Sequence, residues 1–249
     1  MAWDAYLNSF HAERPGITEA ILRRSRHAGP DDAGDPYRWL ADAVPGPGPV
    51  LDLGCGSGPL FRELPGRQYA GLDASGAELA AARRAGARPL LRARAPAIPL
   101  RDASVDAVAC SMSLMVITPL PQVLAEISRV LRPGGVLAAT VPAGGPLRAG
   151  DRIISAGLVA ALGRVPGYPA APAPHRLPGA GLRVIADERR RFGYRMHGRA
   201  DADRLLASLY LPGLSPRRYQ LARAWLRLLA VFRLEFPVPL RRIIAERCL

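Results

Sequence analysis

Residues 49–61, PVLDLGCGSGPLF, combine an apolar run with an acid and three glycines at alternate positions. The pattern reads D-x-G-x-G-x-G and runs from Asp52 to Gly58. Glycines in a turn after a strand tolerate positive φ angles and let a ligand approach bare backbone. The stretch therefore predicts a ligand-binding turn at the end of a buried strand.

Two common phosphate-binding turns do not fit this spacing. A dinucleotide fingerprint counted from Gly54 requires a third glycine at position 59, which is Pro59. A P-loop requires a lysine, and the sequence contains none. The acid at the end of the strand would repel a pyrophosphate but would attract a cationic group. S-adenosylmethionine (SAM), which carries a sulfonium and an ammonium and no phosphate, has that charge profile.

Strands and helices alternate around this turn from about residue 38 to residue 142. The predicted strands are 50–54, 68–73, 88–93, 105–112 and 136–142, and the main helices between them are 75–86 and 119–131. Parallel strands need crossover helices, so the alternation predicts a doubly wound α/β sheet. Asp73 ends the second strand, where it can accept hydrogen bonds from two ribose hydroxyls.

The segments on either side of this core are less regular. Residues 1–28 are predicted to be helical, with a break at Pro15–Gly16. After residue 142, helices are predicted at 152–163, 202–210 and 217–232, and strands at 182–187, 191–197 and 239–247. In the helix 217–232 the predicted buried stripe is Leu221, Trp225, Leu228, Leu229 and Phe232. We expect that stripe to pack on the sheet or on a second subunit.

Four segments occur in the order and spacing of a known family over about residues 48–142: VLDLGCGSG, GLDAS, IPLRDASVDAVACSMSL and EISRVLRPGGVLAATVP. They resemble the successive motifs of class I SAM-dependent methyltransferases of the small-molecule, type 11-like branch. The resemblance implies a doubly wound, mostly parallel seven-stranded sheet of Rossmann-like form. It also implies an N-terminal helical lid and a helical and loop cover inserted after strand five.

The same resemblance assigns the cofactor site. The implied cofactor-binding residues are Asp52, Gly54, Cys55, Gly56, Asp73, Ala74, Arg94, Ala95 and Ser111. The glycine turn passes under the methionine part, Asp73 holds the ribose, Ala74 lies near the adenine, and Ser111 lines the methionine end. Arg94 departs from the family, which often has an acid there for the adenine amino group. Either neighbouring backbone takes over, or the alignment slips, or cofactor binding is weaker; a solvated loop arginine is the slightly favoured interpretation.

The sequence indicates less clearly which residues bind or activate the methyl acceptor. Methyl transfer needs a base only if the nucleophile must lose a proton, and the candidate bases are His11, His27, His175 and His197. His11 is the most interesting because the family's N-terminal helix often folds over the cofactor, although a helix-surface histidine is the slightly favoured alternative. Tyr6 and Arg14 of the same segment, and Met115 in the apolar run SLMVITPL, are predicted on the substrate side.

Composition limits the remaining choices. The 249 residues are 49% apolar, which is enough for one domain with a substantial core: 1–44 as lid, 48–142 as cofactor core and 143–249 as cover and last strands. The sequence shows no leader and no run of about 18 apolar residues. The three cysteines are far apart, which argues against a metal knuckle or a disulfide framework. We therefore expect a cytoplasmic protein that uses no metal.

The charge is strongly asymmetric. All 34 basic residues are arginine, with 16 arginines against 14 acids in residues 1–150 and 18 against 7 in residues 151–249. The leading hypothesis is methyl transfer from SAM to O, N or C of a small molecule, in secondary metabolism. Because the C-terminal part is basic, an rRNA or tRNA methyltransferase is an alternative hypothesis. Because Arg94 replaces the usual acid, a protein of this fold that does not transfer methyl groups is a further alternative. The oligomeric state stays open.

Overall fold

The structure, a computed structural model, describes residues 3–27, 29, 34–169 and 177–248. Its helices are α1 (Trp3–Glu13), α2 (Ile17–Leu22), α3 (Pro36–Ala41), η1 (Leu60–Glu63), α4 (Gly76–Arg84), α5 (Leu120–Val130), α6 (Ala149–Leu162), η3 (Pro178–Ala180), α7 (Arg199–Ala207) and α8 (Pro216–Val231). Its strands are β1 (Ser25–His27), β2 (Val50–Leu53), β3 (Tyr69–Asp73), β4 (Leu90–Arg92), β5 (Val105–Ser111), β6 (Leu131–Pro142), β7 (Leu182–Arg195) and β8 (Glu235–Arg247).

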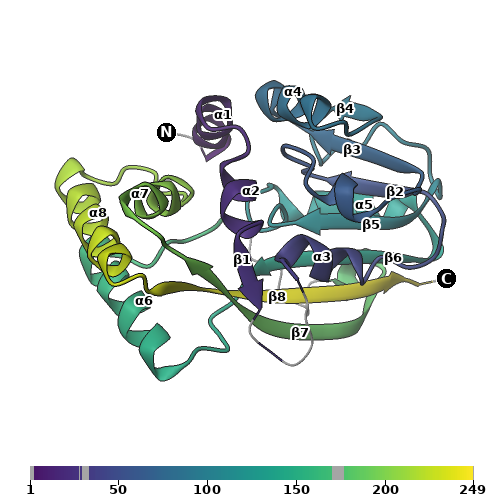
Figure 1. Ribbon diagram of the computed structural model, residues 1–249. Coiled ribbons are helices and arrows are strands. Elements are labelled where there is room, and N and C mark those ends of the chain that lie inside the picture. The colour runs from purple at the N-terminus through teal and green to yellow at the C-terminus, as the bar shows by residue number, and fades with distance from the viewer. Residues whose placement is uncertain (1–2, 28, 30–33, 170–176, 249) are drawn as a thin grey trace.

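The strands form one mixed sheet in the order β1-β7-β8-β6-β5-β2-β3-β4 (Figure 1). Strands β2 to β6 run parallel, and β8, β7 and β1 are added antiparallel at one edge. The predicted doubly wound α/β sheet is confirmed, but it has eight strands instead of seven. The extra strand is β1, whose three residues are too few to show an alternating pattern and lie in the segment 1–28 predicted as helix. The strands predicted at 182–187 and 191–197 are one continuous strand, β7.

Helices cover both faces of the parallel part of the sheet. Leu51 and Val108 pack with Ile127 of α5 on one face, and Ala107 packs with Leu40 of α3 on the other. Burial on both faces explains why these strands are nearly continuous apolar runs in the sequence. Asp52, the acid in β2, therefore lies in an apolar environment, where an acid is expected only for a specific role.

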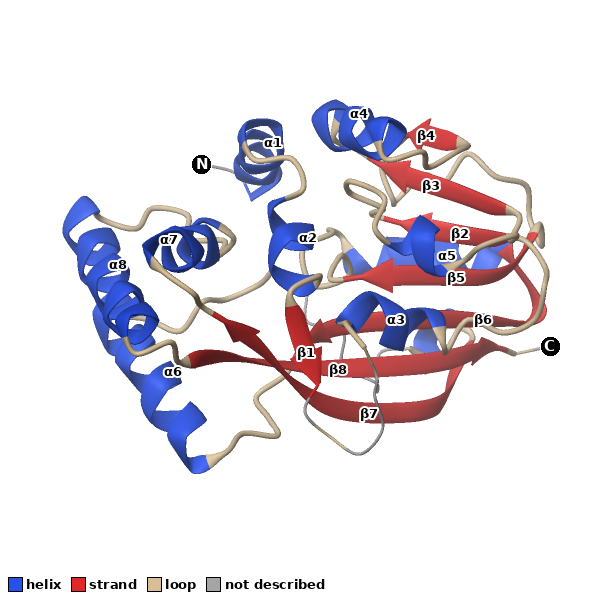
Figure 2. Ribbon diagram, viewed as in Figure 1, coloured by secondary structure: helices blue, strands red, loops and turns tan. Residues whose placement is uncertain are grey.

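The carboxyl ends of β2, β3 and β5 meet at one edge of the sheet. The chain passes from β2 to β3 on one side, while β5 pairs on the other side of β2. Such a switch point is where open α/β sheets bind ligands. Helices α1 and α2 lie across this edge, and α6, α7 and α8 form a lobe beyond them (Figure 2). Within the described ranges, no helix is long and apolar enough to cross a membrane.

Helix α8 buries only part of the predicted stripe, since Leu229 is buried and Trp225 is partly buried but the other three residues are exposed. Its buried residues are Ala222, Leu226, Leu229 and Ala230. Leu221, Leu228 and Phe232 of the predicted stripe are exposed. The reason is that α8 packs against α6 and α7 instead of the sheet. Trp225 comes so close to α6 that it donates a hydrogen bond to the carbonyl of Ile154 and fills the space over Gly157.

A buried ion pair joins the lobe to the sheet. Arg191 of β7 donates to both carboxylate oxygens of Asp151 in α6, at 2.6 and 2.7 Å, and also to Glu235 of β8 at 2.6 Å. The hydrogen bonds from Arg191 hold the pKa of Asp151 below its ordinary value. Because Arg191 and Asp151 are both buried, removing one partner leaves the other charge without compensation.

We expect Arg191→Met to lower the free energy of unfolding by about 3–5 kcal/mol, since Asp151 would stay buried and unpaired. Urea unfolding followed by circular dichroism measures the change. The matched control is Arg183→Met, which removes an exposed pair with Glu246. That variant should lose no more than about 1 kcal/mol. Equal losses in the two variants would show that the Arg191 pair does not anchor the lobe.

Candidate functional site

The glycine turn after β2 has the backbone that its sequence predicts. Gly54 and Gly56 have φ angles of 74° and 53°, in the left-handed region. The amides of Gly54 and Cys55 both donate to the carbonyl of Leu72, at 2.8 and 3.0 Å, which fixes the turn to the end of β3. A Cβ on Gly54 would lie 2.5 Å from the Cβ of Ser113. Glycine is therefore required at position 54 by both conformation and space.

Asp73 is held in one orientation at the end of β3. Its two carboxylate oxygens accept hydrogen bonds from the amides of Gly56, at 2.9 Å, and Ser75, at 2.8 Å. Burial raises the pKa of Asp73, and these two hydrogen bonds oppose that shift. Each carboxylate oxygen has a second lone pair, so the side chain can still accept hydrogen bonds from a ligand.

Asp52 is a buried acid, and only one of its two carboxylate oxygens accepts a hydrogen bond from a described residue. The hydroxyl of Tyr69 donates to Oδ2 at 2.8 Å, whereas Oδ1 has no hydrogen-bond partner among the described residues. Burial raises the pKa of Asp52 to about 7. A buried, unpartnered carboxylate oxygen beside a cavity is a suitable place for a cationic group of a ligand.

The strand ends enclose one cavity, called the central cavity below, with about 1080 Å³ of empty space when its open mouth is included. All the predicted cofactor residues line it: Asp52, Gly54, Cys55, Gly56, Asp73, Ala74, Arg94, Ala95 and Ser111. The lining also contains five carboxylates, Asp4, Glu19, Asp52, Asp73 and Glu78, but one arginine, Arg94. Asp4 and Glu19 pair with arginines, and the remaining acids, Asp52, Asp73 and Glu78, favour a cationic ligand.

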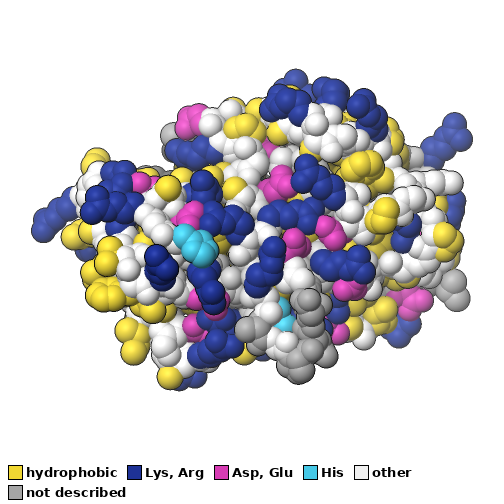
Figure 3. Space-filling view, in the orientation of Figure 1, with side chains coloured by type: hydrophobic (Ala, Val, Ile, Leu, Met, Phe, Trp, Pro, Cys, Tyr) yellow, Lys and Arg dark blue, Asp and Glu magenta, His cyan; other side chains and the backbone are white. Residues whose placement is uncertain are grey.

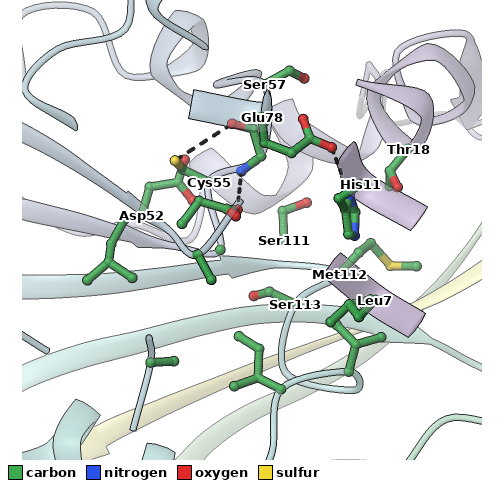
Figure 4. Close-up of a pocket in the computed structure, with 18 of the residues that line it drawn as sticks. Leu7, His11, Thr18, Asp52, Cys55, Ser57, Glu78, Ser111, Met112 and Ser113 are labelled. Atoms are coloured by element: carbon green, nitrogen blue, oxygen red, sulfur yellow. Dashed lines mark hydrogen bonds and ion pairs between the residues drawn. The ribbon is translucent and has the colours of Figure 1, made fainter. Parts of the chain in front are cut away.

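His11 faces the central cavity and is not a helix-surface histidine. Its Nδ1 lies 2.8 Å from Oε1 of Glu78, and its Nε2 lies 3.1 Å from the hydroxyl of Tyr210. Figure 4 shows the carboxylate of Glu78 pointing from α4 toward His11. The other oxygen of Glu78 accepts a hydrogen bond from the amide of Gly16 at 2.9 Å. The side chains of His11, Glu78 and Tyr210 all line the central cavity.

Sequence reasoning missed Glu78 and Tyr210. Glu78 follows Ser75 by three positions, a spacing typical of a helix cap, and Ser75 does accept a hydrogen bond from the Glu78 amide. Because the helix cap already accounts for Glu78, the sequence gives no sign that its side chain also contacts His11. Tyr210 follows the helix α7 and carries no motif, so only its tertiary contacts reveal it.

Arg94 lies at the mouth of the cavity and is 62% exposed. It donates to Asp4 of α1 at 2.6 Å, and the hydroxyl of Thr118 donates to the other oxygen of Asp4 at 3.3 Å. The side chain is thus neither simply solvated nor placed deep in the site. It links the loop after β4 to the N-terminal helix.

Three residues predicted on the substrate side do not line the cavity. Tyr6 accepts a hydrogen bond from the amide of Leu211, Arg14 lies over the ring of Phe10, and Met115 is buried in the main core. Their roles toward a substrate stay predictions.

The other candidate bases lie elsewhere or are not described. His27 is hydrogen-bonded to the carbonyl of Arg191 on β7, and His197 precedes α7, with its amide donating to Asp201. His175 is outside the described residues. No group of three or more His, Cys, Asp or Glu side chains in the described ranges could hold a metal ion.

The fold and the cavity define a class of protein: a Rossmann-like domain with a glycine turn and acids at the strand ends that line one cavity. Comparison with known proteins specifies the family. Residues 51–139 match the family described as a methyltransferase domain. The chain is similar to malonyl-[acyl-carrier protein] O-methyltransferase of Serratia marcescens, with 36% identity over 121 residues and 47% of each chain covered. It is also similar to trans-aconitate 2-methyltransferase of Deinococcus radiodurans, with 40% identity over 100 residues and 38% of each chain covered.

The chain spans about half or less of the length of these curated relatives. Among solved structures it resembles phosphoethanolamine N-methyltransferase 2 of Haemonchus contortus, solved with phosphomonomethylethanolamine and S-adenosylhomocysteine (SAH). The TM-score is 0.60 at 18% identity, covering 100% of this chain and 61% of that one, which shows a shared fold. Residues 51–139 thus match a methyltransferase domain, and this part of the chain resembles the class I SAM-dependent methyltransferases, as the sequence motifs predict.

The glycine turn yields a stability prediction that needs no ligand. Gly54→Ala should destabilise the protein more than Gly56→Ala, by about 1–3 kcal/mol, because its Cβ would overlap Ser113. Both variants share the strain of a positive φ, and the nearest atom to a Cβ on Gly56 lies 3.8 Å away. Thermal unfolding of the two variants measures the difference. Equal destabilisation would contradict the close approach of Gly54 and Ser113.

Proposed function

We propose that the protein transfers a methyl group from SAM to an O, N or C atom of a small, largely apolar acceptor, in secondary metabolism. The observation that carries this proposal is the acidic central cavity at the carboxyl ends of β2, β3 and β5, within a strongly basic chain. A ligand with positive charge and no phosphate satisfies these carboxylates, and a nucleotide phosphate does not.

The residues present fit SAM part by part. Asp73 has lone pairs for the ribose hydroxyls, and the unpartnered oxygen of Asp52 suits a positively charged group. The glycine turn lets the ligand approach its backbone closely. When bound, SAM supplies an electrophilic methyl group on a sulfonium. The protein's own task is then to hold donor and acceptor aligned in a cavity that excludes water.

The acceptor side of the cavity favours a small molecule. Leu7, Met112, Val116 and Ile117 line it together with His11 and Tyr210. The named relatives act on malonyl-[acyl-carrier protein] and trans-aconitate, which supports a small organic acceptor group for this chain as well. We place this activity in the cytoplasm, because the three cysteines are free thiols that suit a reducing compartment.

The first prediction concerns cofactor binding. Isothermal titration calorimetry should detect binding of SAM and SAH to the wild-type protein. Asp73→Ala should weaken both by about 10- to 100-fold, since hydrogen bonds to a charged group are lost. The control Asp106→Ala removes a carboxylate at the opposite end of β5, where it pairs with Arg132, and should leave binding unchanged. Absence of binding to the wild type would refute the proposed function.

The raised pKa of Asp52 predicts a pH dependence. Its folded-state pKa of about 7 exceeds the ordinary value of 3.8, so the folded state holds a proton that the unfolded state has lost between these pH values. The contribution of Asp52 to stability should therefore fall as pH rises through this window, by at most about 1.4 kcal/mol per pH unit. The difference between wild type and Asp52→Asn in urea unfolding isolates that contribution.

A cation bound near Asp52 should favour the carboxylate, so SAM binding should release a proton near pH 7. Calorimetry in two buffers with different protonation enthalpies measures the released proton. Asp52→Asn should bind without this release. Equal apparent enthalpies for the wild type in both buffers would contradict a role for Asp52 toward the cation.

A further inference from the structure

Tyr210, His11 and Glu78 form a continuous hydrogen-bonded line at the wall of the central cavity. The Tyr210 hydroxyl lies 3.1 Å from His11 Nε2, and His11 Nδ1 lies 2.8 Å from Glu78 Oε1. Tyr210 follows α7, His11 belongs to α1 and Glu78 belongs to α4, yet all three line one cavity. Such a line of hydrogen bonds can carry a proton away from the cavity. In the proposed methyl transfer, that proton would come from the methyl acceptor.

The direction of each hydrogen bond follows from its neighbours. The Gly16 amide donates to Glu78 Oε2, so Oε1 is left to accept a proton from His11 Nδ1. Nδ1 then carries the hydrogen and Nε2 carries the lone pair. Burial raises the pKa of Tyr210, so its hydroxyl stays protonated and donates to Nε2. Thr18 also hydrogen-bonds to the Tyr210 hydroxyl, which leaves one lone pair of the Tyr210 oxygen to accept a hydrogen bond from the cavity.

The position of the Tyr210 hydroxyl is fixed by ring packing. The Tyr210 ring centroid lies 4.6 Å from that of Phe10, 6.1 Å from that of Trp3 and 6.2 Å from that of Tyr168. A pre-positioned polar group in an apolar wall favours proton transfer, because little reorganisation is needed when the acceptor binds.

Holding α1 in place does not require this line. Trp3 of α1 donates to the carbonyl of Val116 at 2.8 Å, and Asp4 pairs with Arg94 across the cavity mouth. Tyr6 adds a third anchor by accepting from the amide of Leu211. The polar line through His11 is therefore additional to the contacts that seat the helix.

We propose that Tyr210 and His11 are catalytic residues that deprotonate a neutral, weakly acidic hydroxyl of the acceptor, such as a phenol, and that Glu78 is the positioning residue for His11. This inference rests on the proposed function. The acceptor proton passes to the Tyr210 oxygen while the Tyr210 proton passes to His11 Nε2. The acceptor oxygen forms the new O–CH₃ bond, the S–CH₃ bond breaks, and its electron pair stays on sulfur. The resulting imidazolium faces the Glu78 carboxylate.

The charge of the cavity supports a neutral acceptor. A carboxylate acceptor is already an anion, so it needs no base and would meet the excess of lining carboxylates. A phenol enters uncharged, and its proton leaves only as the methyl group arrives. The acceptor class proposed here thus differs from malonyl and aconitate groups.

The test compares two phenols as acceptors, with the methyl ether and SAH measured by mass spectrometry. At a mildly alkaline assay pH, 4-nitrophenol is largely ionised and 4-methylphenol is not. Tyr210→Phe and His11→Gln should lower kcat for 4-methylphenol by about 10²-fold or more. Both should lower kcat for 4-nitrophenol far less, because no proton remains to be removed. Each loss is taken relative to the wild type on the same phenol, so repulsion of the anionic 4-nitrophenolate by the lining carboxylates does not enter the comparison. The control Tyr219→Phe removes an exposed hydroxyl of α8 that does not line the cavity and should leave both rates unchanged.

Glu78→Gln tests the positioning role. It should lower kcat for 4-methylphenol with little change in KM, and activity on 4-nitrophenol should be largely retained. A purely structural role would instead lower both activities together and weaken SAM binding in calorimetry. Equal losses on the two phenols in these variants would overturn the relay. A wild-type protein that binds SAM but methylates neither phenol, or methylates trans-aconitate instead, would overturn the acceptor class; failure to bind SAM would instead refute the proposed function.

Discussion

The buried carboxylate of Glu78 is the interaction on which the architecture of the site depends. The side chain is 3% exposed, and a carboxylate at that depth is tolerated only when donors satisfy it. Both donors, His11 Nδ1 and the Gly16 amide, come from the N-terminal segment. Satisfying Glu78 therefore ties α4 to the N-terminal segment, in addition to the contacts of Trp3, Asp4 and Tyr6 that seat α1. The same interaction fixes the orientation of the histidine that faces the cavity.

Electrostatics organise the rest of the molecule through pairing. Among the described residues of the segment 151–249, seven arginines form ion pairs with carboxylates. In the face shown in Figure 3, arginines are interspersed with acidic side chains across the surface. Pairing does not change the net charge of this region, which has 18 arginines against 7 acids, so an RNA substrate stays an alternative. The carboxylates that line the central cavity are the exception in this basic chain.

The cofactor half of the site could be predicted from sequence because its signals are local. A glycine turn, the acid before it and the acid ending the next strand are each recognisable within a few residues, and parallel strand ends must meet. On the acceptor side the sequence singled out His11 but not its partners, because Glu78 lies 67 residues and Tyr210 lies 199 residues away along the chain. Leu221 and Leu228 show the same limit. Periodicity predicted an apolar stripe on α8, but only the packing partners decide which face is buried.

This division also explains what similarity to known methyltransferases can say. The family match covers residues 51–139, which contain the glycine turn, Asp73 and the strand ends. His11, Gly16 and Tyr210 lie outside that range, so the proposed acceptor surface combines unmatched parts of the chain with matched residues such as Glu78 and Met112. A shared cofactor half therefore constrains the methyl donor and leaves the acceptor unconstrained. The chemistry of the acceptor has to be inferred from the groups at the wall itself: a tyrosine hydroxyl, an imidazole held in one tautomer and the carboxylate that holds it.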